Sequence, residues 1–154
     1  MSVDILKCDN VNLFCLGTMM AHRSVVKYMN SAIKKSGVTI NQIYLLFIID
    51  RLRGDNLSCM AKKGVMDRTT LIRGIQNLRG YVSLHKNIDV DQRFLYPALT
   101  KKGADLLEQW MPKVLDLEKG FQILAGDGDA FIRFVEFFSS EMTTLKKDID
   151  SNQE

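Results

Sequence analysis

The stretch LSCMAKKGVMDRTTLIRGIQNLRGYV, residues 57–82, contains two short helical segments separated by a tight connection. Ser58 is a suitable N-cap for the first segment. Asp67 is a suitable N-cap for the second, which is predicted over residues 68–79 and closed by Gly80. Because two short helices joined by a turn make a helix-turn-helix, the stretch predicts that motif.

The second helix of this pair has an apolar face and a polar face. Leu71, Ile75 and Leu78 recur at steps of four and three and therefore share one side. The remaining side chains face outward and are polar or basic: Arg68, Thr69, Arg73, Gln76 and Asn77. The helix is thus predicted to pack on a core with one face and to offer the other face to a partner.

A β-hairpin is predicted next. Residues 81–86 alternate in strand fashion, residues 87–92 are polar and turn-like, and residues 93–99 form a second strand. Pro97 cannot donate a ladder hydrogen bond, so it must lie at an edge or near the strand end. Thr100 then caps another helix.

Helical patterns flank this module on its N-terminal side. Residues 11–35 are predicted to form a long helix that ends at Gly37. Thr39 and Gln42 match a capping box for a second helix that runs to about Leu52. The first helix carries one stripe at helical spacing, made of Cys15, Met19, His22, Val26, Met29 and Ile33.

Two further helices are predicted on the C-terminal side, the second of them capped by Asp129. That last helix carries an aromatic stripe made of Phe131, Phe134, Phe138, Met142 and Leu145. We interpret the stripe as a dimer interface with the first helix as its partner, and packing inside the chain's own core is the alternative. The pattern as a whole predicts a mainly α fold with a small β-hairpin wing, a winged helix-turn-helix with N- and C-terminal dimerisation helices.

Length and charge distribution restrict the kind of partner. A chain of 154 residues predicts one domain, and its net charge is only +3. Residues 51–102 nevertheless hold 11 Lys and Arg against 4 Asp and Glu, whereas the rest of the chain is net acidic. A clustered positive field suits a polyanion such as nucleic acid, and a basic surface without a partner is the alternative.

The sequence lacks the patterns that are typical of secreted proteins, membrane proteins and enzymes. The chain begins with no secretory signal pattern, and its longest apolar run, residues 43–49, is shorter than the about 20 residues of a membrane span. Three irregularly spaced cysteines fit a reducing compartment, so a cytoplasmic protein without a membrane partner is expected. His22 and His85 match no catalytic or zinc pattern, and neither a cofactor, a metal nor an enzymatic activity is expected.

Several short motifs follow one another between residues 57 and 103. Ala61 precedes the sequence Asp67-Arg68-Thr69-Thr70 by six residues, a D-x-R pair follows, and an L-T-x-x-G motif ends the stretch; the later residues are Asp91, Arg93, Leu99, Thr100 and Gly103. In this order the motifs resemble the winged helix-turn-helix of the MarR family of transcription regulators. With the flanking helices, the resemblance covers nearly the whole chain.

The resemblance implies an architecture and a partner. Residues 1–154 would form a single MarR-like domain, with the DNA-binding module at 39–100 and the dimerisation helices at 11–35 and 101–149. Such homodimers read a pseudo-palindromic double-stranded DNA operator whose half-sites lie about 34 Å apart. The resemblance therefore implies a sequence-specific transcription regulator, and a repressor is the usual case.

The helix at residues 68–79 would then be the recognition helix in the major groove. Arg73 is the candidate for a guanine contact and Gln76 for an adenine contact. Three further side chains are expected at a phosphate or a thymine methyl, namely Arg68, Thr69 and Thr70. Asn77 completes the set on this helix.

The wing supplies two more candidates. Arg93 is expected to enter the minor groove, where positive charge is favoured. Asp91 either orients the wing or pairs with a nearby arginine, and a simple turn-forming role is the alternative.

The family also implies an effector that releases DNA, commonly a small aromatic molecule held near the dimer helices. His22 and Arg23 are candidates for contacting a carboxylate, and Tyr44 and Phe47 are candidates for lining the cavity. A hydrogen-bonded core position is the alternative for His22, and a structural ion pair is the alternative for Arg23.

Two other functions are kept as alternatives. Cys15 resembles the sensing cysteine of the hydroperoxide-responsive branch of the family, which would make the chain a thiol-based oxidant sensor. Met19 stands where that branch has a tyrosine, so Tyr28 is the candidate to replace it, and a buried packing role is the alternative for the cysteine. A winged-helix dimer that has lost DNA binding and contacts another protein is the remaining alternative.

Overall fold

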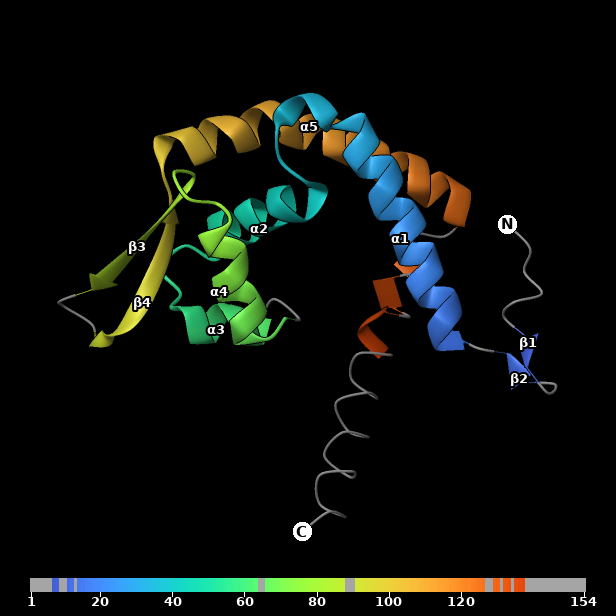
Figure 1. Cartoon of the computed structure of the whole chain (residues 1–154), viewed down its shortest axis with the longest axis horizontal. Coiled ribbons are helices and arrows are strands. Elements are labelled where there is room, and N and C mark those ends of the chain that lie inside the picture. Colours follow the sequence, from blue (N-terminus) through green and yellow to red (C-terminus); the bar gives the residue numbers. More distant parts are fainter. Residues whose placement is uncertain are drawn as a thin grey trace, which may run out of the picture. The chain divides into compact units, whose positions relative to one another are not determined.

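A computed structural model gives the fold of the chain (Figure 1). It describes residues 7–8, 11–12, 14–63, 66–87, 91–126, 129–130, 132–133 and 135–137, with the backbone alone at 7–8, 11–12, 14, 87, 91–93 and 124–125. The chain divides into two units, residues 1–114 and residues 115–154, and their boundary falls inside a helix.

The N-terminal helix is shorter than the predicted range of 11–35. Helix α1 spans Phe14–Ala32 and is followed by a 3₁₀ turn, η2, at Lys34–Ser36. Strand β2, Val11–Asn12, pairs antiparallel with strand β1, Lys7–Cys8, so its backbone groups are satisfied by a ladder instead of a helix. The prediction of the helix start was therefore wrong by three residues.

Helix α2, Ile40–Arg51, begins at the predicted capping box. The N–H of Gln42 donates to Thr39 Oγ1 at 3.3 Å, and the N–H of Thr39 donates to Gln42 Oε1 at 2.8 Å. These two bonds satisfy donors that a helix N-terminus otherwise leaves without partners. The capping box predicted from the sequence is confirmed.

Helix α3 spans Leu57–Lys63, and its cap differs from the prediction. Asn56, not Ser58, is the capping residue, because Asn56 Oδ1 accepts hydrogen bonds from the N–H groups of Ser58 and Cys59, both at 3.0 Å. Asparagine and serine are about equally good N-caps, so the sequence alone did not separate them.

Helix α4 spans Arg68–Gln76 and ends earlier than predicted. Its last turn tightens, because the N–H of Leu78 donates to the carbonyl of Ile75 at 3.0 Å. This turn carries Leu78 fully into the core, and Gly80 follows with a φ of 87°. The predicted apolar face is confirmed, because Leu71, Ile75 and Leu78 are buried. The predicted end of the helix at residue 79 was wrong, since α4 ends at Gln76.

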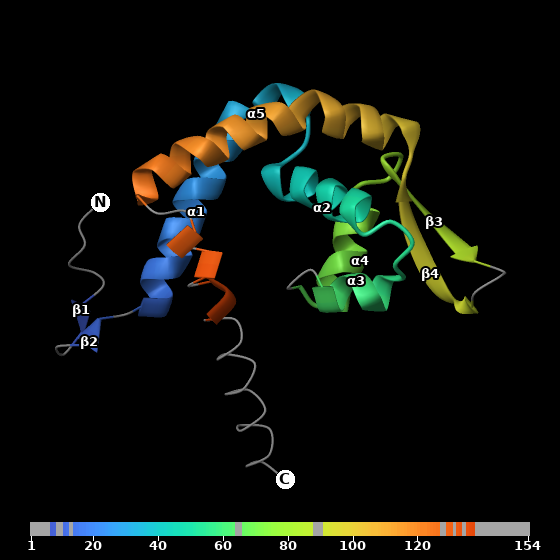
Figure 2. The same cartoon turned by 180° about the vertical axis from the view of Figure 1, so that it is seen from behind.

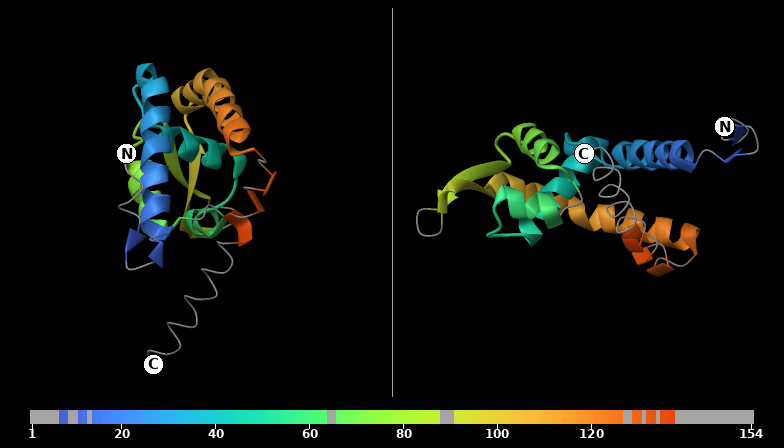
Figure 3. Two further views of the ribbon diagram at one scale, coloured as in Figure 1. Left: turned by 90° about the vertical axis from the view of Figure 1, so that its right-hand side faces the viewer. Right: turned by 90° about the horizontal axis from the view of Figure 1, so that it is seen from below.

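The wing is a two-stranded antiparallel hairpin of β3, Val82–Asn87, and β4, Asp91–Leu99. Leu84 stands opposite Pro97, and the register shifts between Lys86 and Asn87. Since the sheet has two strands, Pro97 lies on an edge strand, as predicted. The hairpin projects beyond α3 and α4 (Figure 3).

The core of the first unit is built by α1, α2, α3, α4 and the start of α5. Its fully buried large side chains are Met29, Ile33, Ile40, Ile43, Leu46, Ile49, Met60, Leu71, Leu78 and Val114. Of the stripe predicted on the first helix, Met29 and Ile33 at its C-terminal end belong to this core. Cys15 and His22 are exposed, as is Met19 at 53%.

Helix α5 spans Lys101–Ala125 and begins at the predicted cap, where the N–H of Gly103 donates to Thr100 Oγ1 at 3.2 Å. Helical backbone continues in residues 129–130, 132–133 and 135–137. The predicted aromatic stripe lies outside the described residues, namely Phe131, Phe134, Phe138, Met142 and Leu145.

Candidate nucleic-acid interface

The start of α4 is held by a tight local cap. Asp67 has an extended backbone, with φ −69° and ψ 156°, and its Oδ1 accepts the N–H of Thr70 at 2.8 Å. The Thr70 hydroxyl donates to the second carboxylate oxygen of Asp67. These bonds from the Thr70 hydroxyl and N–H lower the pKa of Asp67 below its ordinary value, because they stabilise the ionised carboxylate. The Thr70 hydroxyl is therefore committed to the cap, which leaves its methyl group for a contact with DNA.

The outer face of α4 carries the predicted polar set. Arg68, Thr69, Arg73, Gln76 and Asn77 are all exposed, whereas Leu71, Ile75 and Leu78 are buried. Within the described ranges, neither Arg68 nor Arg73 is paired with a carboxylate. The face thus presents two unneutralised guanidinium groups.

The inner face of α4 lies close against α2. A Cβ on Gly74 would approach Leu45 Cδ2 to 2.5 Å, which is too short for a real contact. Figure 2 shows α4 next to α2. The small residue therefore lets α4 pack directly on α2, which carries four of the ten fully buried large side chains.

The base of the wing is tied to both neighbouring helices. Thr100 donates through its hydroxyl to the carbonyl of Gly80 at 2.7 Å and through its N–H to the carbonyl of Tyr81 at 3.0 Å. A Cβ on Gly103 would overlap that same Tyr81 carbonyl. Lys102 Nζ lies 4.6 Å from the centroid of the Tyr81 ring, a cation–π contact. The wing is thereby fixed relative to α4.

The two wing candidates fall in β4 at its N-terminal end. The backbone of Asp91 and Arg93 belongs to the strand, while their side chains lie outside the described residues. The neighbouring Lys86 and His85 of β3 are exposed. The position of Arg93 at the outer end of the hairpin agrees with the predicted position, and its contact with DNA stays a prediction.

Some of the basic residues in this module are neutralised. Lys63 of α3 donates to Asp55 Oδ2 at 2.8 Å, and this bond raises the pKa of the lysine. Arg53 is paired with Asp50 at the end of α2. In the described part of the helix-turn-helix, the exposed basic residues without an ion pair are Lys62 on α3, Arg68 and Arg73 on α4, and Arg79 just after α4.

The chain is similar in sequence to bacterial transcription regulators. No model of a known protein family matches the chain. The DNA-binding transcriptional repressor ScoC of Bacillus subtilis is 29% identical over 150 residues, which cover 84% of this chain and 73% of ScoC. The HTH-type transcriptional regulator Hpr of Bacillus pumilus is 33% identical over 108 residues, 66% of this chain and 52% of Hpr. The chain thus spans about half the length of that Hpr and about three quarters of ScoC.

Solved structures match over nearly their whole length. The Mycobacterium tuberculosis regulator MosR in complex with DNA has a TM-score of 0.76 at 23% identity, over 90% of this chain and 98% of MosR. AbsC, a MarR-family regulator from Streptomyces coelicolor, has a TM-score of 0.70 at 14% identity, over 92% and 98%. The chain has the fold of the MarR-family winged-helix regulators. Bordetella bronchiseptica BpsR, whose DNA binding is regulated by 6-hydroxynicotinic acid, matches with a TM-score of 0.67 at 19% identity, over 89% and 96%.

The predicted effector residues are not brought together in the described part of this MarR fold. His22 and Arg23 are exposed on α1. Tyr44 lines a hollow of about 540 Å³ between α2 and α4, and Phe47 lines a different hollow of about 350 Å³ between α2 and α5. Two of the four residues thus line hollows, and the hollows are separate.

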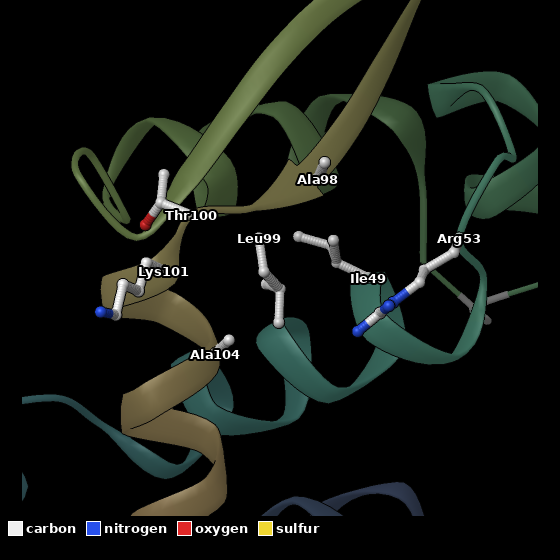
Figure 4. Close-up of a pocket in the computed structure, with 7 residues that line it drawn as sticks. All are labelled: Ile49, Arg53, Ala98, Leu99, Thr100, Lys101 and Ala104. Atoms are coloured by element: carbon white, nitrogen blue, oxygen red, sulfur yellow. The ribbon is translucent and has the colours of Figure 1, made fainter.

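Sequence reasoning missed Arg53. This residue lines the hollow beside Phe47 and also a neighbouring one of about 290 Å³. In Figure 4, Arg53 and Lys101 lie on opposite sides of Leu99, and Ile49 lies between Leu99 and Arg53. The end of α2 and the start of α5 are about fifty positions apart in the sequence, so no local pattern could have predicted that they meet.

Cys15 is exposed near the start of α1. Tyr28, proposed from the sequence to stand beside its sulfur, follows 13 residues later in the same helix. At 1.5 Å per residue this separation is about 20 Å, so the tyrosine of the same chain cannot contact the thiol. That part of the oxidant-sensing hypothesis is corrected.

Large apolar side chains remain exposed in both units of the MarR fold. They are Met19, Val25 and Tyr28 on α1, Leu84 and Leu95 in the wing, and Leu115, Ile123, Ile132, Val135 and Phe137 in the second unit. Among the described residues, no helix is both long enough and apolar enough to cross a membrane. No described cluster of three acidic, histidine or cysteine residues is suited to hold a metal ion.

Proposed function

We propose that the chain is a homodimeric transcriptional repressor that binds a pseudo-palindromic DNA operator through α4 and the wing. One observation carries the proposal: the exposed face of α4 presents Arg68 and Arg73 with no carboxylate partner among the described residues, opposite a buried apolar face. Exposed arginine at this place is suited to phosphate and to guanine edges. The DNA-bound MosR structure, which shares the fold, supports this docking.

In this proposal α4 lies in the major groove and the hairpin lies over the adjacent minor groove. Arg73 and Gln76 read bases, Arg68 and Thr69 contact phosphate, Thr70 offers a methyl group, and Asn77 completes the set. Arg93 enters the minor groove beside Asp91. Residues 1–154 act as one MarR-like domain, in which the winged module at 39–100 is held between dimerisation helices.

We further infer that a small aromatic acid releases the DNA. The hollow beside Phe47 combines an aromatic ring with Arg51, which stacks on that ring, and with Arg53, which is paired with Asp50 on the same wall. An aromatic carboxylate would bind here by pairing with Arg51 or by replacing Asp50 at Arg53. His22, Arg23 and Tyr44 are proposed to complete the site only when a second chain is present. The regulation of BpsR by 6-hydroxynicotinic acid supports this class of ligand.

The thiol alternative rests on the exposure of Cys15. If Cys15 is the sensor, a Cys15→Ser variant should stay on DNA when peroxide releases the wild type. If peroxide releases both proteins equally, or neither of them, the oxidant-sensing hypothesis fails.

The first test is selection of duplexes from a random DNA library, followed by fluorescence anisotropy on the selected and a scrambled duplex. Affinity for the selected duplex should be higher and should fall steeply from 50 mM to 200 mM salt, because phosphate contacts release counterions. 6-Hydroxynicotinic acid should then weaken binding in the same assay. Equal, weak binding to both duplexes would instead favour the protein-interaction alternative.

A matched control distinguishes the loss of a specific DNA contact on α4 from the loss of one positive charge anywhere on the chain. Arg68→Ala and Lys35→Ala each remove one positive charge, and both residues are exposed. Only Arg68→Ala should lower the affinity and the salt dependence. If both variants lose the same affinity, the proposed docking of α4 is wrong.

A further inference from the structure

The side chain of Gln42 has two ends with different partners. Its Oε1 accepts the N–H of Thr39 at 2.8 Å within the capping box of α2. Its Nε2 donates to the carbonyl of Asn77 at 3.5 Å, across 35 positions of sequence. Because a backbone N–H requires an acceptor, the first contact fixes which end of the amide faces which way.

The second partner is a helix terminus. Asn77 is the C-cap of α4, and carbonyls at a helix C-terminus have no intrahelical donor. A donor placed there also complements the negative end of the helix dipole. Gln42 therefore joins the N-terminus of α2 to the C-terminus of the proposed recognition helix.

The same turn of α2 is joined to α1. The N–H of Ile40 donates to Asn30 Oδ1 at 2.7 Å, and Asn30 stands beside the buried Met29. Hydrogen bonds in one helical turn thus connect the proposed dimerisation helix with the proposed recognition helix.

Packing alone leaves part of the α2–α4 contact empty. Gly74 lies against Leu45, but a hollow of about 540 Å³ opens beside it. Gln42 and Asn77 lie together on the wall of this hollow, with Met66 and Thr70 also lining it. The polar link from Gln42 lies at the wall of this hollow, where the side-chain packing between α2 and α4 is incomplete.

We propose that Gln42 is a positioning residue that holds the tilt of α4 relative to α1 and so the spacing of the two DNA half-sites that a dimer accepts. The inference rests on the proposed function. It adds a residue that touches no DNA and yet determines which operator spacing is bound.

The test uses Gln42→Glu in the full-length chain. The carboxylate has nearly the same shape and still accepts the N–H of Thr39, so α2 keeps its cap. It cannot donate to Asn77, and its charge faces that carbonyl. The matched control is Asn41→Asp, which adds the same charge one residue earlier, at an exposed position.

Affinities are measured by anisotropy on the duplex selected by the wild type and on duplexes with one base pair added or removed between the half-sites. Gln42→Glu should bind the selected duplex about three- to tenfold more weakly, as expected for one lost hydrogen bond. Its ratio of affinities between the selected and the altered spacings should shrink by a similar factor. Asn41→Asp should keep the wild-type ratio. An unchanged ratio in Gln42→Glu overturns the inference, even if all affinities fall uniformly.

A second measurement needs no DNA. A spin label on Cys59, with Cys8 and Cys15 replaced by serine, gives the distance between the helix-turn-helix modules of a dimer. Gln42→Glu should broaden this distribution relative to Asn41→Asp, and identical distributions would refute the positioning role. If the wild type selects no DNA sequence while the distribution still broadens, the proposed function fails and the link between helices stands.

Discussion

Thr70 and Arg73 lie one helical turn apart on α4, and their polar groups have different surroundings. The Thr70 hydroxyl donates to Asp67, whereas Arg73 is exposed and, among described residues, not paired with a carboxylate. A bidentate base contact requires a free guanidinium, so Arg73 has the capacity for sequence reading that the Thr70 hydroxyl lacks.

Arg73→Ala is therefore expected to cost about 1–3 kcal/mol of specific binding, roughly 5- to 150-fold in Kd, and to relax the base preference at one position of each half-site. Arg93→Ala should weaken binding with a smaller change in sequence preference, because minor-groove contacts discriminate less. Kd values on selected and singly substituted duplexes measure both effects. Wild-type binding by both variants would contradict the docking.

The cap at Asp67 predicts a dependence of stability on pH. The pKa of this carboxyl is lowered below its ordinary value of 3.8 in the folded chain. Its contribution to the free energy of unfolding is thus fully present above that value and is lost as pH falls through the lowered pKa. Urea midpoints between pH 5 and pH 2 should decrease less for Asp67→Asn, which keeps an acceptor for the N–H of Thr70 but cannot ionise. Parallel curves for the two proteins would contradict this role.

At the scale of elements, the junction of wing and α5 depends on close backbone approach. Gly103 packs against the Tyr81 carbonyl, and Thr100 bonds to Gly80 and Tyr81 at the same place. The three contacts join the end of the helix-turn-helix to the start of α5. Any side chain at position 103 must push the wing away from that helix.

Gly103→Ala is expected to lower the free energy of unfolding by about 1–3 kcal/mol, as overpacking does. Gly120→Ala is the control, because a Cβ there meets nothing within 4 Å and glycine weakens a helix interior. That variant should gain about 0.5–1 kcal/mol. Urea unfolding measures both, and a Gly103→Ala midpoint equal to the wild type would show that the junction relaxes freely.

At the scale of the whole molecule, the exposed apolar side chains of α1 are suited to pack against a second chain in the proposed dimer. Met19→Lys should raise the dissociation constant of the proposed dimer by at least about tenfold, because a methionine side chain contributes roughly 1.5–3 kcal/mol when buried. Ser31→Lys places the same charge at an exposed polar position of α1 and should leave the dimer intact. Sedimentation velocity across a concentration series distinguishes them. Equal association of both variants would place the interface elsewhere.

Apart from the N-cap of α3, the sequence by itself determined the caps whose partners lie within one turn. The caps Thr39–Gln42, Asp67–Thr70 and Thr100–Gly103 join residues three positions apart, so residue type and spacing were sufficient to predict them. The alternation of the wing strands and the apolar face of α4 follow in the same way from the period of each element.

Only the tertiary structure decided the features that depend on distant contacts. Helix α4 ends at Gln76 because the core takes in Leu78, and Arg53 lines a hollow because α2 meets the start of α5. The bond from Gln42 to Asn77 crosses 35 positions. The physical reason is that local propensities differ by less than about 1 kcal/mol per residue, whereas the burial of one large side chain contributes more. Packing therefore overrides the local pattern wherever elements meet.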